Sequence, residues 1–203
     1  MNHERFPNRG RGMAMAAGLL IAACCPVVAH ADGGMALPLK NGDFTEVVNV
    51  GSSRAIVWSH MAHWRPSHPR HILGGQHAGR WAAEFRSQNQ AVYQDVATLA
   101  ASTEGSTMFT LRFDAGRFAG ANGELKAFVA LHAPSGEVIL SRSATINHLK
   151  GAWENHELAL SAADAVPVGA FVRVAFQRTD SSGGGILAVS RVTLHQQGTV
   201  LRR

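Results

Sequence analysis

Alternation of apolar and polar residues with a period of two constrains the fold of this chain more than any other feature. Phe109, Leu111 and Phe113 share one face of residues 107–113, and residues 171–178 show the same alternation. A period of two separates the side chains onto the two faces of a strand, whereas the 3.6-residue helical period is missing beyond the N-terminal segment. The pattern predicts strands with one buried and one solvated face.

Turn residues separate the predicted strands and limit the fold class further. Pro134-Ser135-Gly136 lies between residues 125–131 and 137–141, so these two runs are predicted to form a hairpin. Residues 125–131 are apolar on both faces except at Lys126, which favours a central strand. No internal repeat occurs. We therefore predict an all-β jelly-roll β-sandwich of two antiparallel sheets with eight or nine strands.

The first 31 residues have the features of an export signal. Arginines precede an apolar run at residues 13–23, which is short for a membrane span, and residues 29–31 form a small-x-small cleavage motif. An alternative is a lipobox that ends at Cys24, which would make the chain an outer-membrane lipoprotein, and a further alternative is an uncleaved anchor. Each alternative predicts an exported protein, periplasmic or extracellular, with membrane contact only if Cys24 is lipidated.

Charge and cysteine content exclude some classes of function. Cys24 and Cys25 both lie in the signal segment, so no disulfide is expected in the mature domain. Without the first 31 residues the chain keeps 16 basic and 13 acidic residues, and the basic residues form no run or stripe. A nucleic-acid partner is therefore not expected. We predict a signal peptide at 1–31, a linker at 32–40, the jelly-roll domain at 41–197 and a tail at 198–203.

Several short motifs follow one another in an order typical of a known family. In chain order they are Asn41-Gly42-Asp43-Phe44, a loop Trp (Trp58 or Trp64), Gly79-Arg80-Trp81-Ala82, Tyr93-Gln94-Asp95-Val96, Phe109-Thr110-Leu111-Arg112-Phe113, and Trp153. The order over residues 41–195 resembles the galactose-binding-like β-sandwich, in particular carbohydrate-binding modules of the family four and family nine kind. This resemblance implies a secreted protein that binds a glycan or polysaccharide without a catalytic site.

The same resemblance implies a structural calcium ion, and the chain departs from the family there. Ser190-Arg191-Val192 stands where the family's last strand carries an Asp ligand, and Thr45 stands where Glu is common. Ser190 and Arg191 are poor calcium ligands, whereas Asp43 and backbone carbonyls are suitable ones. Calcium held at Asp43 therefore stays a hypothesis.

Sugar binding requires flat aromatic faces for the C–H surface of the ring and polar groups for the hydroxyls. Trp64, in a polar loop, is either an exposed platform or a packing residue, whereas Trp81 and Trp153 are expected in the core. We predict stacking by Trp64 and Tyr93. The predicted hydrogen-bonding partners are Gln94, Arg80 and Arg112.

Five histidines fall within eighteen positions: His60, His63, His68, His71 and His77. Imidazoles are good ligands for zinc, copper or nickel, and a loop can bring three of them together. Pro66 and Pro69 argue against a helix in this stretch. The alternative is a set of solvated loop histidines.

Catalytic motifs are missing from the sequence: there is no Gly-x-Ser-x-Gly elbow, phosphate-binding loop or dinucleotide fingerprint. We therefore predict a lectin-like module and no enzyme. The alternatives are a structural envelope protein that binds another protein, and a histidine-cluster metal protein or polysaccharide-active enzyme. A glycan binder predicts Trp64 exposed beside a groove, whereas a protein binder predicts a broad apolar patch without a groove.

Overall fold

The computed structural model describes residues 34–49, 59–67, 73–98, 106–120, 123–147, 149–180 and 185–198. The predicted signal peptide, both cysteines and Trp58 lie outside these ranges. Within these ranges the regular elements are all strands, and no helix has the length and hydropathy to cross a membrane.

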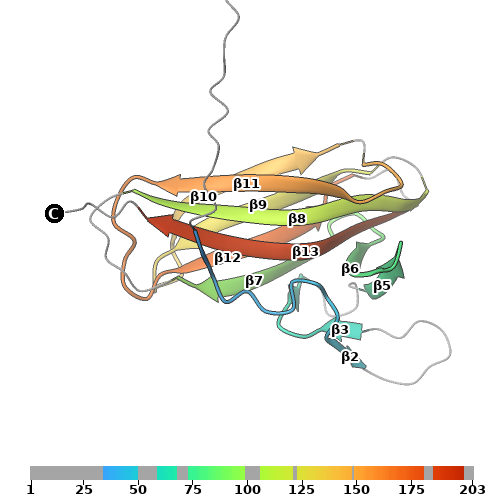
Figure 1. Cartoon of the computed structure of the whole chain (residues 1–203), viewed down its shortest axis with the longest axis horizontal. Coiled ribbons are helices and arrows are strands. Elements are labelled where there is room, and N and C mark those ends of the chain that lie inside the picture. The colour runs from blue at the N-terminus through green and yellow to red at the C-terminus, as the bar shows by residue number, and fades with distance from the viewer. Residues whose placement is uncertain are drawn as a thin grey trace, which may run out of the picture. The chain divides into compact units, whose positions relative to one another are not determined.

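Two antiparallel sheets form the domain, one in front of the other in Figure 1. The first sheet has the order β11 (Glu154–Ala162), β8 (Thr107–Gly120), β13 (Gly185–Gly198), β6 (Arg80–Phe85) and β5 (Leu73–His77), with β1 (Met35–Ala36) beside β13. The second has the order β10 (Val138–Ile146), β9 (Leu125–His132), β12 (Phe171–Arg178), β7 (Ala91–Ala97) and β4 (Arg65–Pro66). A separate pair joins β2 (Val47–Asn49) and β3 (Ser59–Met61).

These sheets confirm the predicted jelly-roll sandwich. Nine of the described strands have five residues or more, in agreement with the eight or nine expected. The remaining four are short strands of two or three residues in the N-terminal third of the domain, where turn residues hide any alternation.

The core lies between the two sheets and is built from the alternating residues. Phe109, Leu111 and Phe113 of β8 are at most 1% exposed, as their spacing predicts. Phe113 meets Phe176 of β12 edge-on with ring centroids 4.9 Å apart, so the aromatic contact joins one sheet to the other. The residues between these core positions face outward and are available for other roles.

The predicted hairpin and central strand are both confirmed. β9 and β10 pair around residues 133–136, where the amide of Gly136 donates to the carbonyl of Ala133. β9 lies between β10 and β12, as a central strand should. Its inner residues are buried, but Lys126, Phe128 and Ala130 on its outer face are only half-buried. The apolar outer face of β9 therefore contributes to a surface.

The Asn-Gly-Asp-Phe motif anchors the N-terminal segment to the sandwich. The Asn41 amide donates to the carbonyls of Glu46 and Ala62, and its oxygen accepts from the Glu46 amide. Gly42 lies so close to β13 that a Cβ would sit 2.1 Å from the Val192 carbonyl oxygen. Phe44 is fully buried against the ring of Trp64, 5.1 Å away. The motif thus fixes the path of the chain through residues 37–46.

Candidate functional site

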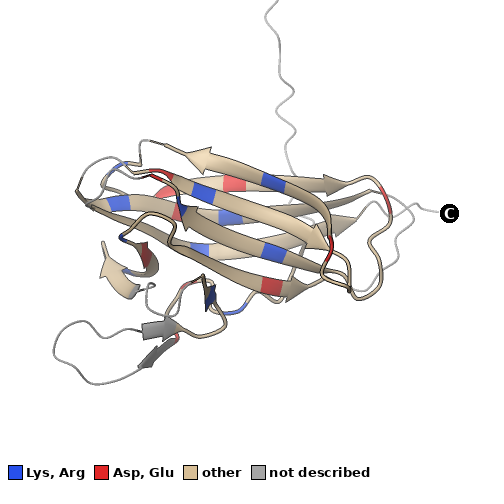
Figure 2. Cartoon of the chain, turned by 180° about the vertical axis from the view of Figure 1, so that it is seen from behind, with Lys and Arg blue, Asp and Glu red and all other residues tan. Residues whose placement is uncertain are grey.

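The outer face of the second sheet carries aromatic and polar side chains that lie in register with one another. In β12 and β7, Arg173 pairs with Asp95 and Ala175 with Tyr93, while Phe171 pairs with Ala97. Paired residues of an antiparallel ladder point to the same face. Because Val92, Val96, Val172 and Val174 face the core, the residues between them face outward. Figure 2 shows this sheet from outside, with the charged positions coloured.

Arg173 contacts both the polar and the aromatic side chains of this outer face. Its Nε and Nη2 donate to the two oxygens of Asp95 at 2.7 and 2.9 Å. The guanidinium carbon lies 4.7 Å from the ring centroid of Tyr93 and 5.9 Å from that of Phe171. The hydrogen bonds that Arg173 donates to Asp95 raise the pKa of Arg173, against the opposing effect of burial. Arg173 is therefore a permanently charged, oriented group between two aromatic rings.

Further rings extend the surface beyond β12. His132 of β9 stacks on Phe171 with centroids 4.8 Å apart and an interplanar angle of 7°. The Nδ1 of His132 lies 3.0 Å from the Gly136 carbonyl oxygen, which fixes the ring. Farther along the outer face of β9, the ammonium of Lys126 lies over the ring of Phe128 at 5.0 Å. We call Tyr93, Phe128, Phe171 and Arg173 the aromatic face.

A groove of about 500 Å³ adjoins the aromatic face at the free edge of β4 and β7. Its volume falls within the range typical of small-molecule sites. Three parts of the chain line it: the N-terminal segment, β4 with the turn before it, and β7. The polar or aromatic residues that line it are Lys40, His63, Trp64, Arg65, Gln94 and Asp95.

Trp64 lines this groove, but the expectation that it is exposed is wrong. Only 5% of its surface is accessible, because the ring packs between Phe44 and Phe176. Its Nε1 donates to the carbonyl of Asn41 at 3.0 Å, so the polar end of the indole is also used within the chain. Trp64 therefore forms part of the groove's floor, and its packing role prevails.

Gln94 also lines the groove, and its side chain acts on the backbone. Its oxygen accepts from the amide of Lys40 at 2.8 Å, and its nitrogen donates to the carbonyl of Lys40 at 2.9 Å. The residue is 6% exposed. Gln94 therefore positions Lys40 rather than reaching into solvent. Of the five predicted sugar-binding residues, Trp64 and Gln94 line this groove, while Tyr93 lies on the adjoining aromatic face.

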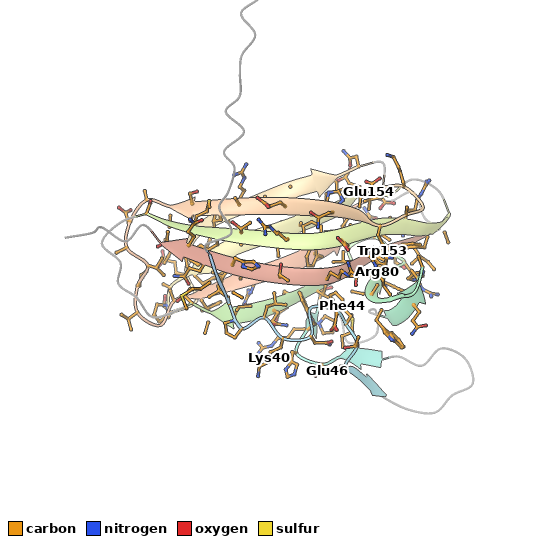
Figure 3. All side chains as sticks on the ribbon, in the orientation of Figure 1. Lys40, Phe44, Glu46, Arg80, Trp153 and Glu154 are labelled. Atoms are coloured by element: carbon orange, nitrogen blue, oxygen red, sulfur yellow. The ribbon has the colours of Figure 1, made fainter. Side chains whose placement is uncertain are left out.

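The structure places the other two, Arg80 and Arg112, on the first sheet. Arg80 Nη1 donates to Asp114 at 2.5 Å, and its guanidinium lies 5.6 Å from the ring of Trp153 (Figure 3). Arg112 Nε donates to Glu157 of the neighbouring strand at 2.9 Å. The prediction that these arginines bind the same ligand as Tyr93 and Gln94 is therefore wrong, since β6 and β8 belong to the first sheet and β7 belongs to the second.

The tryptophans predicted to lie in the core behave differently. Trp81 is 36% exposed, although Ala83 and Phe85 on the same strand are buried. Trp153 is half-buried and its Nε1 donates to the carbonyl of His77. The prediction for Trp81 is wrong because β6 pairs with β13 only from Ala83 to Phe85, so Trp81 lies before the paired part of its strand.

Only part of the histidine cluster can be described. His68, His71 and the side chain of His60 lie outside the described residues. His63 Nε2 is 3.5 Å from Glu46, and His77 Nε2 is 2.7 Å from the buried Glu84. In the described part of the chain, no three His, Cys, Asp or Glu side chains gather as a metal site requires. The zinc hypothesis stays a prediction.

The residues that the resemblance aligns with a calcium ion are used within the chain. Asp43 Oδ1 accepts from the hydroxyl of Thr45 at 3.0 Å. The Ser190 hydroxyl donates to the carbonyl of Trp81 at 2.7 Å. Calcium takes six to eight oxygen ligands, and these side chains do not fit that set. Calcium held at Asp43 therefore stays a prediction.

Sequence reasoning missed Phe171, Arg173, Asp95, Lys40 and Arg65 as site residues. The alternation in residues 171–178 does place Arg173 opposite Val172 and Val174. What the pattern does not show is which strands are neighbours, and only the β7–β12 pairing brings Arg173 to Asp95 and Tyr93.

Comparison with known proteins gives likeness in fold only. No protein-family model matches the chain, and no curated protein matches it. Among solved structures, the module TmCBM61 in complex with β-1,4-galactotriose is 16% identical, with 80% of this chain and 98% of that chain covered and a TM-score of 0.49. The arabinose-bound α-L-arabinofuranosidase MgGH51 is 17% identical, with 79% and 26% covered and a TM-score of 0.48.

A CBM4 structure is 14% identical, with 77% of this chain and 98% of that chain covered and a TM-score of 0.45. Carbohydrate-binding modules are thus among the structures similar to this chain, as the order of its motifs predicts. Because all three TM-scores are below 0.5, we base the function on the chain's own side chains.

Proposed function

We propose that this chain is an exported, non-catalytic module that binds a glycan chain along the aromatic face and the adjoining groove. The observation that carries the proposal is the position of Arg173, clamped to Asp95 and lying over the rings of Tyr93 and Phe171. Export is part of the proposal and is supported by the sequence of residues 1–31.

The aromatic face combines the two kinds of contact that sugars use. The rings of Tyr93, Phe171 and Phe128 are half-buried and so keep accessible surface for the C–H side of a pyranose. No described residue accepts a hydrogen bond from Arg173 Nη1, so this group is available to sugar hydroxyls. Because Asp95 fixes the guanidinium, ligand binding costs little side-chain entropy.

A broad surface suits a polymer better than a small molecule. The aromatic face spans β9, β12 and β7, and the groove continues it past β7 to β4. Successive sugar units of one chain have room along this path. The first sheet presents mainly ion-paired charges instead, for example Arg112 with Glu157.

The experiment is a glycan array on the purified protein, followed by titration of any hit against variants. Tyr93→Ala and Phe171→Ala are expected to weaken binding by about two- to twelvefold each, from the loss of stacking. Trp81→Ala is the matched control, because it removes an exposed aromatic from the other sheet.

Two results would overturn the proposal. One is that the folded protein binds no glycan on the array. The other is that Trp81→Ala weakens binding while Tyr93→Ala and Phe171→Ala do not, which would move the site to the first sheet.

A further inference from the structure

Positive charge dominates the groove beside the aromatic face. Lys40 and Arg65 line it and are both exposed, whereas Asp95 is the one carboxylate among its lining residues. Within the described ranges, neither Lys40 nor Arg65 has a carboxylate at salt-bridge distance. A concave site with excess charge of one sign attracts ligands of the opposite sign.

The carboxylates in and near the groove already lie close to basic side chains of the protein. Both oxygens of Asp95 accept from Arg173, at 2.7 and 2.9 Å. At the rim, Glu46 lies 3.5 Å from His63. A ligand therefore meets Lys40 and Arg65 as cations that have no carboxylate of the described residues at salt-bridge distance.

The backbone fixes the positions of both cations. The amide and carbonyl of Lys40 are both bonded to the buried side chain of Gln94. Arg65 pairs with Tyr93 in the β4–β7 ladder, so the two side chains point to the same face. Pro66 follows Arg65 and restricts its backbone to the extended region. The cations are thus attached to ordered segments next to the stacking platform.

From this arrangement we infer that the ligand is an acidic glycan, whose carboxylate or sulfate binds Lys40 and Arg65 in the groove while neighbouring sugar units stack on the aromatic face. The inference rests on the proposed function and adds the class of ligand. The planar fork of Arg65 suits a two-oxygen anion, and the ammonium of Lys40 adds a flexible point charge.

The test compares polymers that differ only in charge. Affinity electrophoresis or calorimetry on the purified protein would use polygalacturonate against its carboxyl-reduced form, and dextran sulfate against dextran. The variants are Lys40→Gln and Arg65→Gln. Lys150→Gln is the matched control, because it removes the same charge from a side chain that is 82% exposed and does not line the groove.

We expect tighter binding of one charged polymer than of its neutral partner, and a loss of about three- to tenfold for each groove variant. Lys150→Gln should leave that affinity unchanged. The charged polymer that shows this loss identifies the anion as carboxylate or sulfate.

The failures are distinguishable. Equal binding of charged and neutral polymers, with Tyr93→Ala weakening both, would overturn the acidic ligand and leave the proposed function standing. An equal loss for Lys150→Gln would also overturn it, because it would show attraction to net charge alone. Binding of none of these polymers, nor of any glycan on the array, would overturn both.

Discussion

At the scale of single residues, the domain contains a cation that serves structure alone. Arg178 at the end of β12 is 1% exposed. Its Nε and Nη2 donate to the two oxygens of Asp180, and its Nη1 donates to the carbonyls of Gly185 and Phe85. The guanidinium therefore joins three separate segments in the interior, where an unpaired charge would be costly.

Arg178→Met is expected to lower the free energy of unfolding by about 3–5 kcal/mol, because it removes the buried guanidinium that pairs with Asp180 and donates to the carbonyls of Phe85 and Gly185. Chemical denaturation measures this change. Arg142→Met is the control, since Arg142 is exposed and, among the described residues, makes one hydrogen bond, to the carbonyl of Ala159. Equal effects of the two substitutions would contradict the structural role of Arg178.

A second residue links stability to pH. Burial lowers the pKa of His156 below its ordinary value, although the charges of Glu154 and Asp114 act in the opposite direction. The ring stacks on Phe113 of the core, and its Nε2 is buried with no hydrogen-bond partner among the described residues. Protonation would therefore place an unpaired N–H in the interior.

The direction in which stability changes with pH follows from which state of the chain takes up a proton first. As pH falls below about 6.5, the unfolded chain protonates this histidine before the folded chain does. The stability from neutral His156 is therefore full above that pH and decreases toward acid. Unfolding measured at about pH 7.5 and 5.5 should show a smaller difference for His156→Phe than for the parent. An unchanged pH dependence would contradict the role of His156.

At the scale of elements, the N-terminal segment depends on close contact with β13. Gly42 accepts the Val192 amide at its carbonyl, and a Cβ on Gly42 would collide with the Val192 carbonyl oxygen. Gly42→Ala is expected to destabilise the domain by about 1–3 kcal/mol through this overlap. Gly151→Ala is the control, because its nearest contact is 3.7 Å away, and it should change stability by no more than about 0.5 kcal/mol.

Thermal or chemical unfolding of the two variants measures the difference. If Gly42→Ala is as stable as Gly151→Ala, then the segment from residue 37 to 46 does not require its packing on β13, and the position of Lys40 in the groove is not fixed as described.

The same elements show what the sequence can and cannot predict. Strict alternation identifies β8, β12 and β13, since one face of each is core and local order reports it. The burial of Trp64 depends on its packing against Phe44 and Phe176, which lie 20 and 112 residues away along the chain. Polar neighbours in sequence therefore make Trp64 look exposed, while contacts between distant segments bury it.

At the scale of the whole molecule, the candidate functional surfaces are an apolar patch that would bind a protein and the aromatic face with its groove. Among the residues that the structure describes, the exposed large apolar side chains lie on separate elements: Met35 in β1, Trp81 in β6, Val138 and Ile139 in β10, and Val168 in the turn before β12. Scattered apolar residues are normal for a protein surface and do not form a protein-binding patch. Because Trp64 is buried and is not the exposed platform expected of a glycan binder, the preference for a glycan over a protein partner rests on the aromatic face and the groove.

The most direct test is backbone-amide NMR of the protein titrated with an oligosaccharide prepared from the polymer that binds best. We expect shifts concentrated in β7, β12 and β4 and around Lys40. Shifts confined to β8, β11 and β13 would contradict the assignment, because they would place the ligand on the outer face of the first sheet.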